Sequence, residues 1–135
     1  MFYRSSGGFR QMVAWQEAHK LTLLIYKTTA AFPLTEQYAM TNQLRRAAYS
    51  IETQLAEGSR MYTAAHQLSY YHRSYGSCAE VDNFLQLSFE LQYFSETQYE
   101  TLLAQLNKAS CLIQRLIEAR AKHAKPSKLP KPAQV

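Results

Sequence analysis

Hydrophobic residues recur with a period of 3.6 along four long segments of the chain, which is the spacing that places side chains on one face of an α-helix. The first segment runs from about Val13 to Phe32, and Pro33 then opposes continuation of the helix. Its apolar stripe consists of Trp15, Ala18, Leu21, Ile25, Thr29 and Phe32. The pattern therefore predicts a first helix over residues 13–32.

The second predicted helix begins near Thr35, whose hydroxyl suits an N-cap, with Glu36 in the first turn, where the helix dipole favours an anion. Its inward stripe consists of Leu44, Ala47, Ala48, Ile51 and Leu55. The residues predicted on the opposite side are Arg46, Tyr49, Thr53 and Arg60. Gly58 suits the left-handed turn that closes a helix.

The third helix is predicted from after Thr63 to about Tyr93, and Ser95 followed by Gln98 predicts a capping box at the start of the fourth. The third stripe consists of Leu68, Tyr71, Cys78, Leu85 and Phe89. The fourth consists of Leu102, Leu103, Leu106, Ala109, Ile113, Leu116 and Ile117. Four helices with short connections pack most simply as an all-α, antiparallel up-down-up-down four-helix bundle.

The predicted domain organisation is an N-terminal extension over residues 1–12, the bundle over residues 13–122 and a tail over residues 123–135. The tail reads "HAKPSKLPKPAQV", in which three prolines alternate with lysines and apolar residues are sparse. We expect this basic Pro/Lys-rich segment to be disordered.

The two cysteines give a prediction about register. Cys78 lies 17 residues before Ser95 and Cys111 lies 16 residues after it, so an antiparallel helix pair brings both to one level of the bundle. The first fifteen residues contain no secretory signal, and the longest apolar run, "LTLLIY", is too short to span a membrane. We therefore expect a cytoplasmic protein, and two reduced, buried core cysteines in preference to a redox pair.

The charge of +5 is unevenly distributed along the 135 residues. Residues 1–118 contain ten basic and ten acidic side chains, so the excess lies in Arg120, Lys122, Lys125, Lys128 and Lys131. Residues 61–100 are acidic and would repel nucleic acid. The basic tail fits either an arm that binds RNA nonspecifically or docks on an acidic patch, or a solvated segment that aids solubility.

The sequence lacks the common signatures of catalysis and metal binding. Di-iron bundles need Glu-x-x-His pairs, and none is present. His66 and His72 lie six residues apart on different helix faces, and His19 and His123 have no carboxylate at ligand spacing. No glycine-rich phosphate loop and no nucleophile elbow occurs either. We expect no metal, no cofactor and no enzymatic activity.

Five short words, "VAWQEAHKL", "IYKTTAAFP", "QLRRAAYSI", "LAEGSR" and "YGSCAEV", occur in a characteristic order and spacing. In these words the chain resembles the four-helix bundle proteins encoded by intervening sequences of bacterial large-subunit ribosomal RNA genes. The accessory variability determinant proteins of diversity-generating retroelements look like relatives. The resemblance covers about Phe9 to Ala121. The matching positions are Arg45, Arg46, Ala47, Ser50, Ile51, Ala56, Glu57, Gly58, Gly76, Ser77 and Glu80.

The resemblance implies a homopentamer, a barrel of five bundles, with a role in binding structured RNA or DNA. In the retroelement relatives the barrel is a partner of reverse transcriptase. The chain departs from the family pattern at Glu52, where a proline is usual, and at Gln54, where an asparagine is usual. Glu52 is expected to place a negative charge beside Arg45 and Arg46.

The arginine pair has two interpretations. Repeated by five-fold symmetry, Arg45 and Arg46 form rings of positive charge that bind phosphates. Alternatively, each guanidinium forks onto a carboxylate such as Glu57 or Glu80, across helices or between subunits. We favour the second, because residues 1–118 carry no net charge.

The stretch "SYYHRSYGS" interleaves aromatic and basic groups through Tyr70, Tyr71, His72, Arg73 and Tyr75. Nucleic-acid surfaces use this mixture, and so do subunit interfaces, which we favour here. Gly76 within the helix is predicted to allow close approach of a neighbouring helix.

The residues predict a non-enzymatic four-helix bundle, and the resemblance implies that it is a homo-oligomer, a pentamer, that binds structured RNA or DNA. The alternative is a structural scaffold or adaptor that binds a protein partner such as a polymerase without direct nucleic-acid contact.

Overall fold

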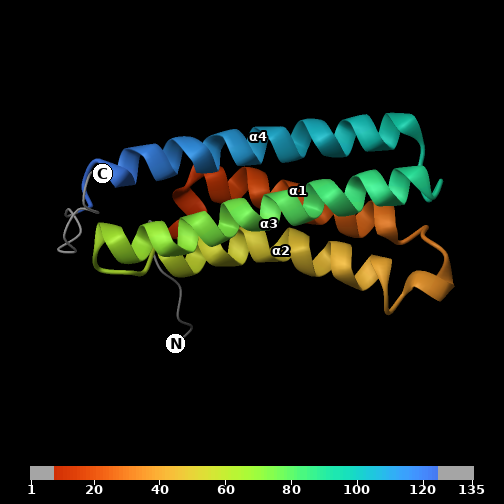
Figure 1. The fold of residues 1–135 in the computed structure, drawn as a ribbon, viewed down its shortest axis with the longest axis horizontal. Helices are drawn as coiled ribbons and strands as arrows, with labels where there is room; N and C mark the ends of the chain where they lie inside the picture. Colours follow the sequence, from red (N-terminus) through yellow and green to blue (C-terminus); the bar gives the residue numbers. More distant parts are fainter. Residues whose placement is uncertain (1–7, 125–135) are drawn as a thin grey trace, which may run out of the picture.

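The computed structural model describes residues 8–124, and every long element within them is a helix (Figure 1). The elements are η1 (Phe9–Gln11), α1 (Val13–Thr29), η2 (Leu34–Glu36), α2 (Met40–Gly58), α3 (Ala64–Glu90) and α4 (Glu96–Ala121). The predicted tail, apart from His123 and Ala124, lies outside the described residues with its lysines Lys125, Lys128 and Lys131, and so do residues 1–7 of the predicted extension.

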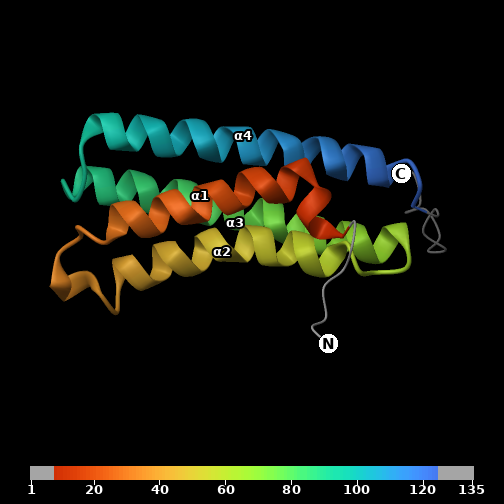
Figure 2. The ribbon, with the colours of Figure 1, turned by 180° about the vertical axis from the view of Figure 1, so that it is seen from behind.

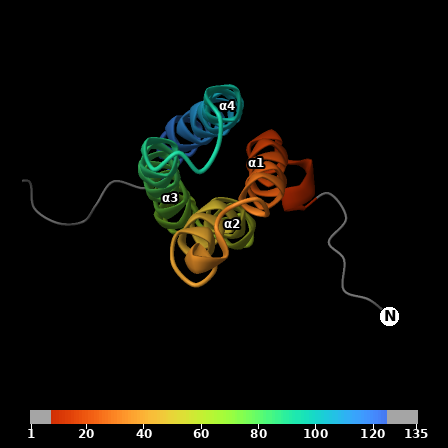
Figure 3. The same ribbon diagram turned by 90° about the vertical axis from the view of Figure 1, so that its right-hand side faces the viewer.

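The four long helices form an up-down-up-down bundle. Successive helices run in opposite directions along the long axis, in Figure 1 and from behind in Figure 2. Seen along that axis they occupy four corners in sequence order, and α4 closes the ring against α1 (Figure 3). The predicted fold class is confirmed.

The core is built from the stripes that the 3.6 period predicts. On α2, all five stripe residues are buried, and Leu44, Ile51 and Leu55 are completely enclosed. Leu21 and Ile25 of α1 are completely enclosed as well. Burial of such side chains contributes about 1.5–3 kcal/mol each to stability. The amphipathic pattern therefore sets which face of each helix turns inward.

Two helix starts follow the capping chemistry of the sequence. The Oγ1 of Thr63 accepts a hydrogen bond from the backbone N–H of His66, which begins α3 where predicted. Ser95 and Gln98 form the predicted capping box of α4, each side chain accepting from the backbone N–H of the other. These side chains satisfy N–H groups that have no partner within the helix.

The third helix ends three residues earlier than predicted. Gln92 has a φ of 64°, in the left-handed region, and its N–H donates to the carbonyl of Phe89. The N–H of Tyr93 donates to the carbonyl of Ser88, which completes a Schellman motif. The end of α3 could not be predicted from the sequence, because the left-handed position is occupied by glutamine instead of the usual glycine.

The predicted start of the second helix at Thr35 is wrong. Residues 34–36 form η2, and α2 begins only at Met40. The carboxylate of Glu36 nevertheless acts at this helix start, because its Oε2 accepts from the backbone N–H of Met40 at 3.0 Å. Its Oε1 accepts from the hydroxyl of Tyr93 at 2.8 Å. The bond from Met40, followed by that from Tyr93, lowers the pKa of Glu36.

The prediction of two buried cysteines is half wrong. Cys78 is buried, while Cys111 is exposed. The prediction that both cysteines lie at one level of the bundle is nearly right, since Cys78 lines a hollow together with Asn107 and Ser110 of α4. Cys111 follows Ser110 directly, and one residue turns a helix by about 100°. That turn carries the thiol of Cys111 to the surface.

Candidate functional site

The words "QLRRAAYSI" and "YGSCAEV" meet at one open hollow of about 320 Å³ between α2 and α3. It is lined by Gln43, Arg46, Ala47, Tyr49, Ser50 and Glu80. Five of these residues lie on α2 and are linked by steps of three or four positions, so they share one face of that helix. We call this hollow the α2–α3 groove.

Two opposite charges in the α2–α3 groove lack partners within the described residues. Arg46 and Glu80 are both exposed, and neither makes an ion pair or hydrogen bond there. The predicted fork of Arg46 onto Glu57 or Glu80 is therefore wrong within the chain, and pairing between subunits stays a prediction. Glu57 is exposed near the end of α2.

Arg45 binds the end of α1 instead of a carboxylate. Its Nε donates to Thr29 Oγ1 at 2.8 Å, and its Nη2 donates to the carbonyl of Tyr26 at 3.3 Å. The guanidinium also lies over the ring of Tyr26, 4.6 Å from its centroid. The carbonyl of Tyr26 also accepts from the backbone N–H of Ala30 at 3.2 Å, so Arg45 is a further donor at the negative end of the helix dipole, which attracts cations. The carboxylate predicted for Arg45 is therefore wrong, since its partners are a hydroxyl, a carbonyl and a ring.

Glu52 does not lie beside the arginine pair as predicted. Its Oε2 accepts from the Nδ1–H of His19 on α1 at 2.8 Å, and that ring stacks on Trp15 at 4.7 Å. The reason is distance along the helix, because six or seven residues separate Glu52 from the arginines by about 10 Å. The charge of Arg46 is therefore left uncompensated by Glu52.

The aromatic and basic residues of "SYYHRSYGS" do not form one platform. Arg73 lies over the ring of Tyr70, 5.0 Å from its centroid. Tyr75 instead lines the hollow toward α4 that contains Cys78. Five residues separate the two tyrosines, which rotates them by about 140° around the helix. His72 is exposed, and Tyr71 is buried in the core.

Neither glycine of the motif has the role predicted for it. Gly58 lies in the last turn of α2, and a Cβ there would come within 2.8 Å of both Tyr70 Cβ and Tyr71 Cε1. It therefore allows close approach of α3, and no left-handed turn forms at that position. Gly76, predicted to allow close approach, has no atom within 4 Å of such a Cβ. That prediction is wrong within the chain.

The remaining predicted residues lie in several places. Ser77 is buried and shares a hydrogen bond of 3.0 Å with Ser50 across α2 and α3. Tyr49 is 41% exposed at the α2–α3 groove, and Arg60 is exposed beyond the end of α2. At the end of α4, Lys122 is exposed and Arg120 is partly buried. The structure thus brings Arg46, Tyr49 and Glu80 together and leaves the others apart.

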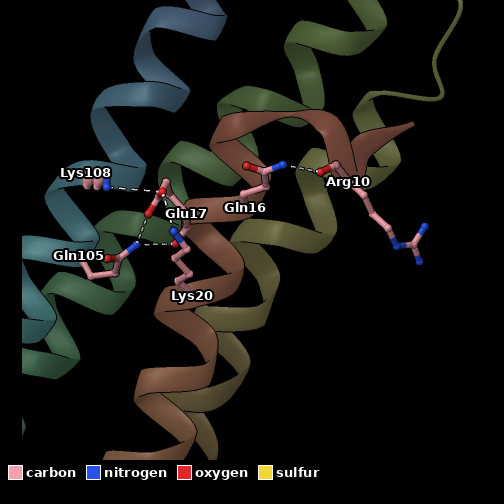
Figure 4. A network of polar contacts seen from close by, with 6 residues as sticks. All are labelled: Arg10, Gln16, Glu17, Lys20, Gln105 and Lys108. Carbon is pink, nitrogen blue, oxygen red and sulfur yellow. Dashed lines mark hydrogen bonds and ion pairs between the residues drawn. The ribbon is translucent and has the colours of Figure 1, made fainter. Parts of the chain in front are cut away.

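A buried carboxylate that sequence reasoning missed links the first helix to the last (Figure 4). Glu17 accepts from Gln105 Nε2 at 2.8 Å, and Lys20 and Lys108 approach it at 3.1 and 3.5 Å. The hydrogen bond from Gln105 is the main reason that its pKa is lowered, against the opposing effect of burial. The sequence did hold a signal for its burial, because Glu17 lies four residues before Leu21 and therefore on the same face of α1.

Residues 8–124 hold neither a membrane-spanning helix nor a cluster of metal ligands. None of the helices there combines the length and apolar character that a membrane crossing requires. Within the described part of the chain, no group of three or more His, Cys, Asp and Glu side chains is placed to share a metal ion.

Comparison with known proteins places the chain in a family. The model of the 23S rRNA-intervening sequence protein matches residues 10–115. The bundle is similar to a crystal structure from Bacteroides thetaiotaomicron, described as a protein of unknown function from the S23 ribosomal protein family, with a TM-score of 0.69. The two are 20% identical over 78% of this chain and 99% of the other. No curated protein matches. Because the family model spans most of the folded chain, the protein belongs to the 23S rRNA-intervening sequence protein family.

Proposed function

We propose that the protein is a non-enzymatic homo-oligomer, a pentamer of four-helix bundles, that binds structured RNA or DNA. The observation that carries the proposal is the pair of unmatched charges, Arg46 and Glu80, in the α2–α3 groove. Opposite charges that lack partners inside a chain suit an interface in which another copy supplies them. Family membership supports the nucleic-acid half, since the family is named for sequences that interrupt 23S rRNA.

Exposed aromatic side chains at the groove and at the separate hollow between α3 and α4 also fit interfaces between copies. Tyr49 is 41% exposed at the groove itself, and Tyr75 is 42% exposed on α3. Tyrosine is enriched at interfaces, because its ring buries apolar area while its hydroxyl keeps a hydrogen-bond partner. This surface therefore supports assembly more directly than it supports phosphate binding.

The experiment measures mass and nucleic-acid binding on the same preparations. Light scattering gives the number of chains, and fluorescence anisotropy follows a labelled RNA hairpin at low and moderate salt. We expect five chains and a binding constant that falls steeply with salt. A single-chain mass contradicts assembly, and unchanged anisotropy at low salt contradicts nucleic-acid binding.

Arg46→Ala tests the role of the α2–α3 groove, with Lys27→Ala as a control that removes one exposed charge from α1. We expect Arg46→Ala to shift the mass toward single chains and Lys27→Ala to leave it unchanged. If Arg46→Ala instead keeps the assembly and abolishes RNA binding, the groove is a phosphate site.

A second candidate function is a scaffold that binds a protein partner, such as a polymerase, without touching nucleic acid. It is favoured by the acidic end, which we define as residues 34–42 and 80–102. These residues carry six carboxylates and no Lys or Arg, and three cations of α1 and α2 lie at the same end, namely Lys27, Arg45 and Arg46. Such a surface repels a polyanion and complements a basic protein. A fully assembled protein that fails to bind RNA at low salt would favour this function.

A further inference from the structure

The two ends of the bundle carry opposite charge. In Figure 1 the acidic end lies at the right, with η2, the end of α3 and the start of α4. Its carboxylates are Glu36, Glu80, Asp82, Glu90, Glu96 and Glu100. The left end holds the connection from α2 to α3 and the last turns of α4. We define residues 59–73 and 115–124 as the basic end.

The basic end gathers side chains from segments that are distant in sequence. It contains five cationic side chains and one carboxylate, Glu118, and a second carboxylate, Glu57, is exposed beside it at the end of α2. The cations are Arg60, Arg73, Arg115, Arg120 and Lys122. Three more lysines follow Ala124 in the sequence. Along the sequence, the excess positive charge therefore follows Glu118.

An open hollow of about 390 Å³ lies at the basic end, between the start of α3 and the end of α4. Tyr62, Thr63, Ala64 and Ala65 line one side, and His123 lines the other. The side chain of Tyr62 is fully exposed, at 102% of its reference area. Its ring therefore makes no packing contribution that would explain a large apolar side chain at this position.

The side chain of Arg120 lies partly buried at the same end, with its Nε enclosed. Among the described residues its Nε has no hydrogen-bond partner, and no carboxylate lies within ion-pair distance of it. Lys122 is exposed and likewise makes no ion pair in the described part of the chain. These two cations can neutralise phosphates without giving up an existing partner.

We propose that the basic end, and not the α2–α3 groove, is the nucleic-acid site, and that it takes a single-stranded segment of RNA or DNA. One base stacks on Tyr62 in the hollow, and Lys122 and Arg120 contact neighbouring phosphates. The inference rests on the nucleic-acid half of the proposed function and gives it a location and a ligand class.

A single strand fits this surface better than a duplex does. An exposed ring binds a base through its face, and the faces of bases are covered by stacking in a helix but free in loops and ends. Single-strand sites combine such aromatic rings with cations that follow the backbone. The basic end offers both, whereas the acidic end would repel either form of nucleic acid.

The test compares two exposed tyrosines at opposite ends of the full-length protein. Tyr62→Ala removes the proposed stacking ring, and Tyr38→Ala is the matched control, because Tyr38 is 87% exposed at the acidic end. The probe is a fluorescein-labelled 12-nucleotide oligouridine, and anisotropy gives the dissociation constant. Loss of base stacking predicts a binding constant about 5- to 100-fold weaker for Tyr62→Ala and an unchanged one for Tyr38→Ala.

A second variant tests the phosphate contacts. Arg120→Gln combined with Lys122→Gln should reduce the slope of log K against log salt by about 1.4, since each contact to a single-strand phosphate contributes about 0.7. Circular dichroism verifies that all variants keep their helices. If the double variant has the same salt slope as the wild type, Arg120 and Lys122 do not contact phosphates.

The failures of the inference and of the proposed function are distinguishable. If neither oligouridine nor the RNA hairpin binds the wild-type protein, the nucleic-acid function fails and the site fails with it. If the wild type binds and Tyr62→Ala binds equally well while Arg46→Ala does not, the function holds and the basic end is the wrong site. Displacement of oligouridine by polyglutamate at equal charge concentration would overturn the nucleic-acid assignment in favour of an acidic protein.

Discussion

At the scale of single residues, the two glycines of the family motif are in different surroundings. Gly58 lies where α2 and α3 come closest, against the backbone-proximal Cβ of Tyr70 and the ring of Tyr71. A Cβ atom cannot swing away as the end of a long side chain can, so the contact leaves no room for alanine. Gly76 has open space around it on the exposed side of α3.

Alanine substitutions should therefore act in opposite directions. We expect Gly58→Ala to lower the free energy of unfolding by about 1–3 kcal/mol, because the helices must move apart. Gly76→Ala is the control and should raise it by about 0.5–1 kcal/mol through better helix propensity. Chemical denaturation of both variants measures the difference. A destabilised Gly76→Ala protein would mean that another copy of the chain packs closely against this glycine.

At the scale of helices, the cysteines show what spacing can and cannot predict. Counting from Ser95 places Cys78 and Cys111 at nearly one level of the α3–α4 pair, and the hollow lined by Cys78 and Ser110 agrees with this. Rotation about the helix axis is a separate variable, and it turns Cys111 outward. Burial of Cys78 raises the pKa of its thiol to about 12.

Thiol labelling should therefore resolve the two cysteines. At pH 8 the buried thiol is ionised in only about one molecule in ten thousand, so we expect one fast-reacting thiol in the native protein and two after unfolding. Cys111→Ser should remove the fast reaction, and Cys78→Ser should preserve it. Two fast thiols in the native protein would show that α3 and α4 separate readily at this level.

Sequence patterns predict the helices well and their side-chain partners poorly. The four stripes and the caps at Thr63 and Ser95 depend on local spacing, which a single segment contains. Arg45 depends on where α1 ends in space, since its partners are the hydroxyl of Thr29 and the carbonyl of Tyr26. Every residue has a backbone carbonyl, so the sequence cannot show which carbonyl an arginine will bind. Sequence reasoning therefore assigns arginines to carboxylates.

The same limit applies to the candidate site. Arg46 and Glu80 could be placed on one surface from their motif words, and the structure agrees. The hollow at Tyr62 could not be predicted, because it forms only when the end of α4 returns to the start of α3 and brings His123 beside it. A site formed by helix ends that are distant in the sequence has no short sequence motif by which it could be recognised.

At the scale of the whole molecule, Glu17 connects the first helix of the bundle to the last through its contacts with Gln105 and Lys108. Hydrogen bonding from Gln105, together with Lys20 and Lys108, lowers its pKa below the usual 4.5. A lowered pKa in the folded state means that the carboxylate stabilises the fold fully above pH 4.5 and progressively less as pH falls through the lowered value. Acid should therefore loosen the contact between α1 and α4.

Glu17→Gln isolates this contribution. We expect the variant to be about 1 kcal/mol less stable at pH 7 and to lose less further stability than the wild type between pH 5 and 3. Denaturation at several pH values measures both effects, with Glu100→Gln as the control at an exposed position. Parallel pH profiles for wild type and Glu17→Gln would show that other carboxylates govern the acid response.

The opposite charges at the two ends of the bundle also act at a distance. They make the molecule an electric dipole whose moment lies along the helices, because the acidic and basic ends are separated along the longest axis (Figure 1). A polyanion exerts a torque on such a dipole as well as a pull. We therefore expect a polyanion to turn the α2–α3 connection of the protein toward itself during diffusion, before any side chain touches it, and added salt to shorten the range of this steering.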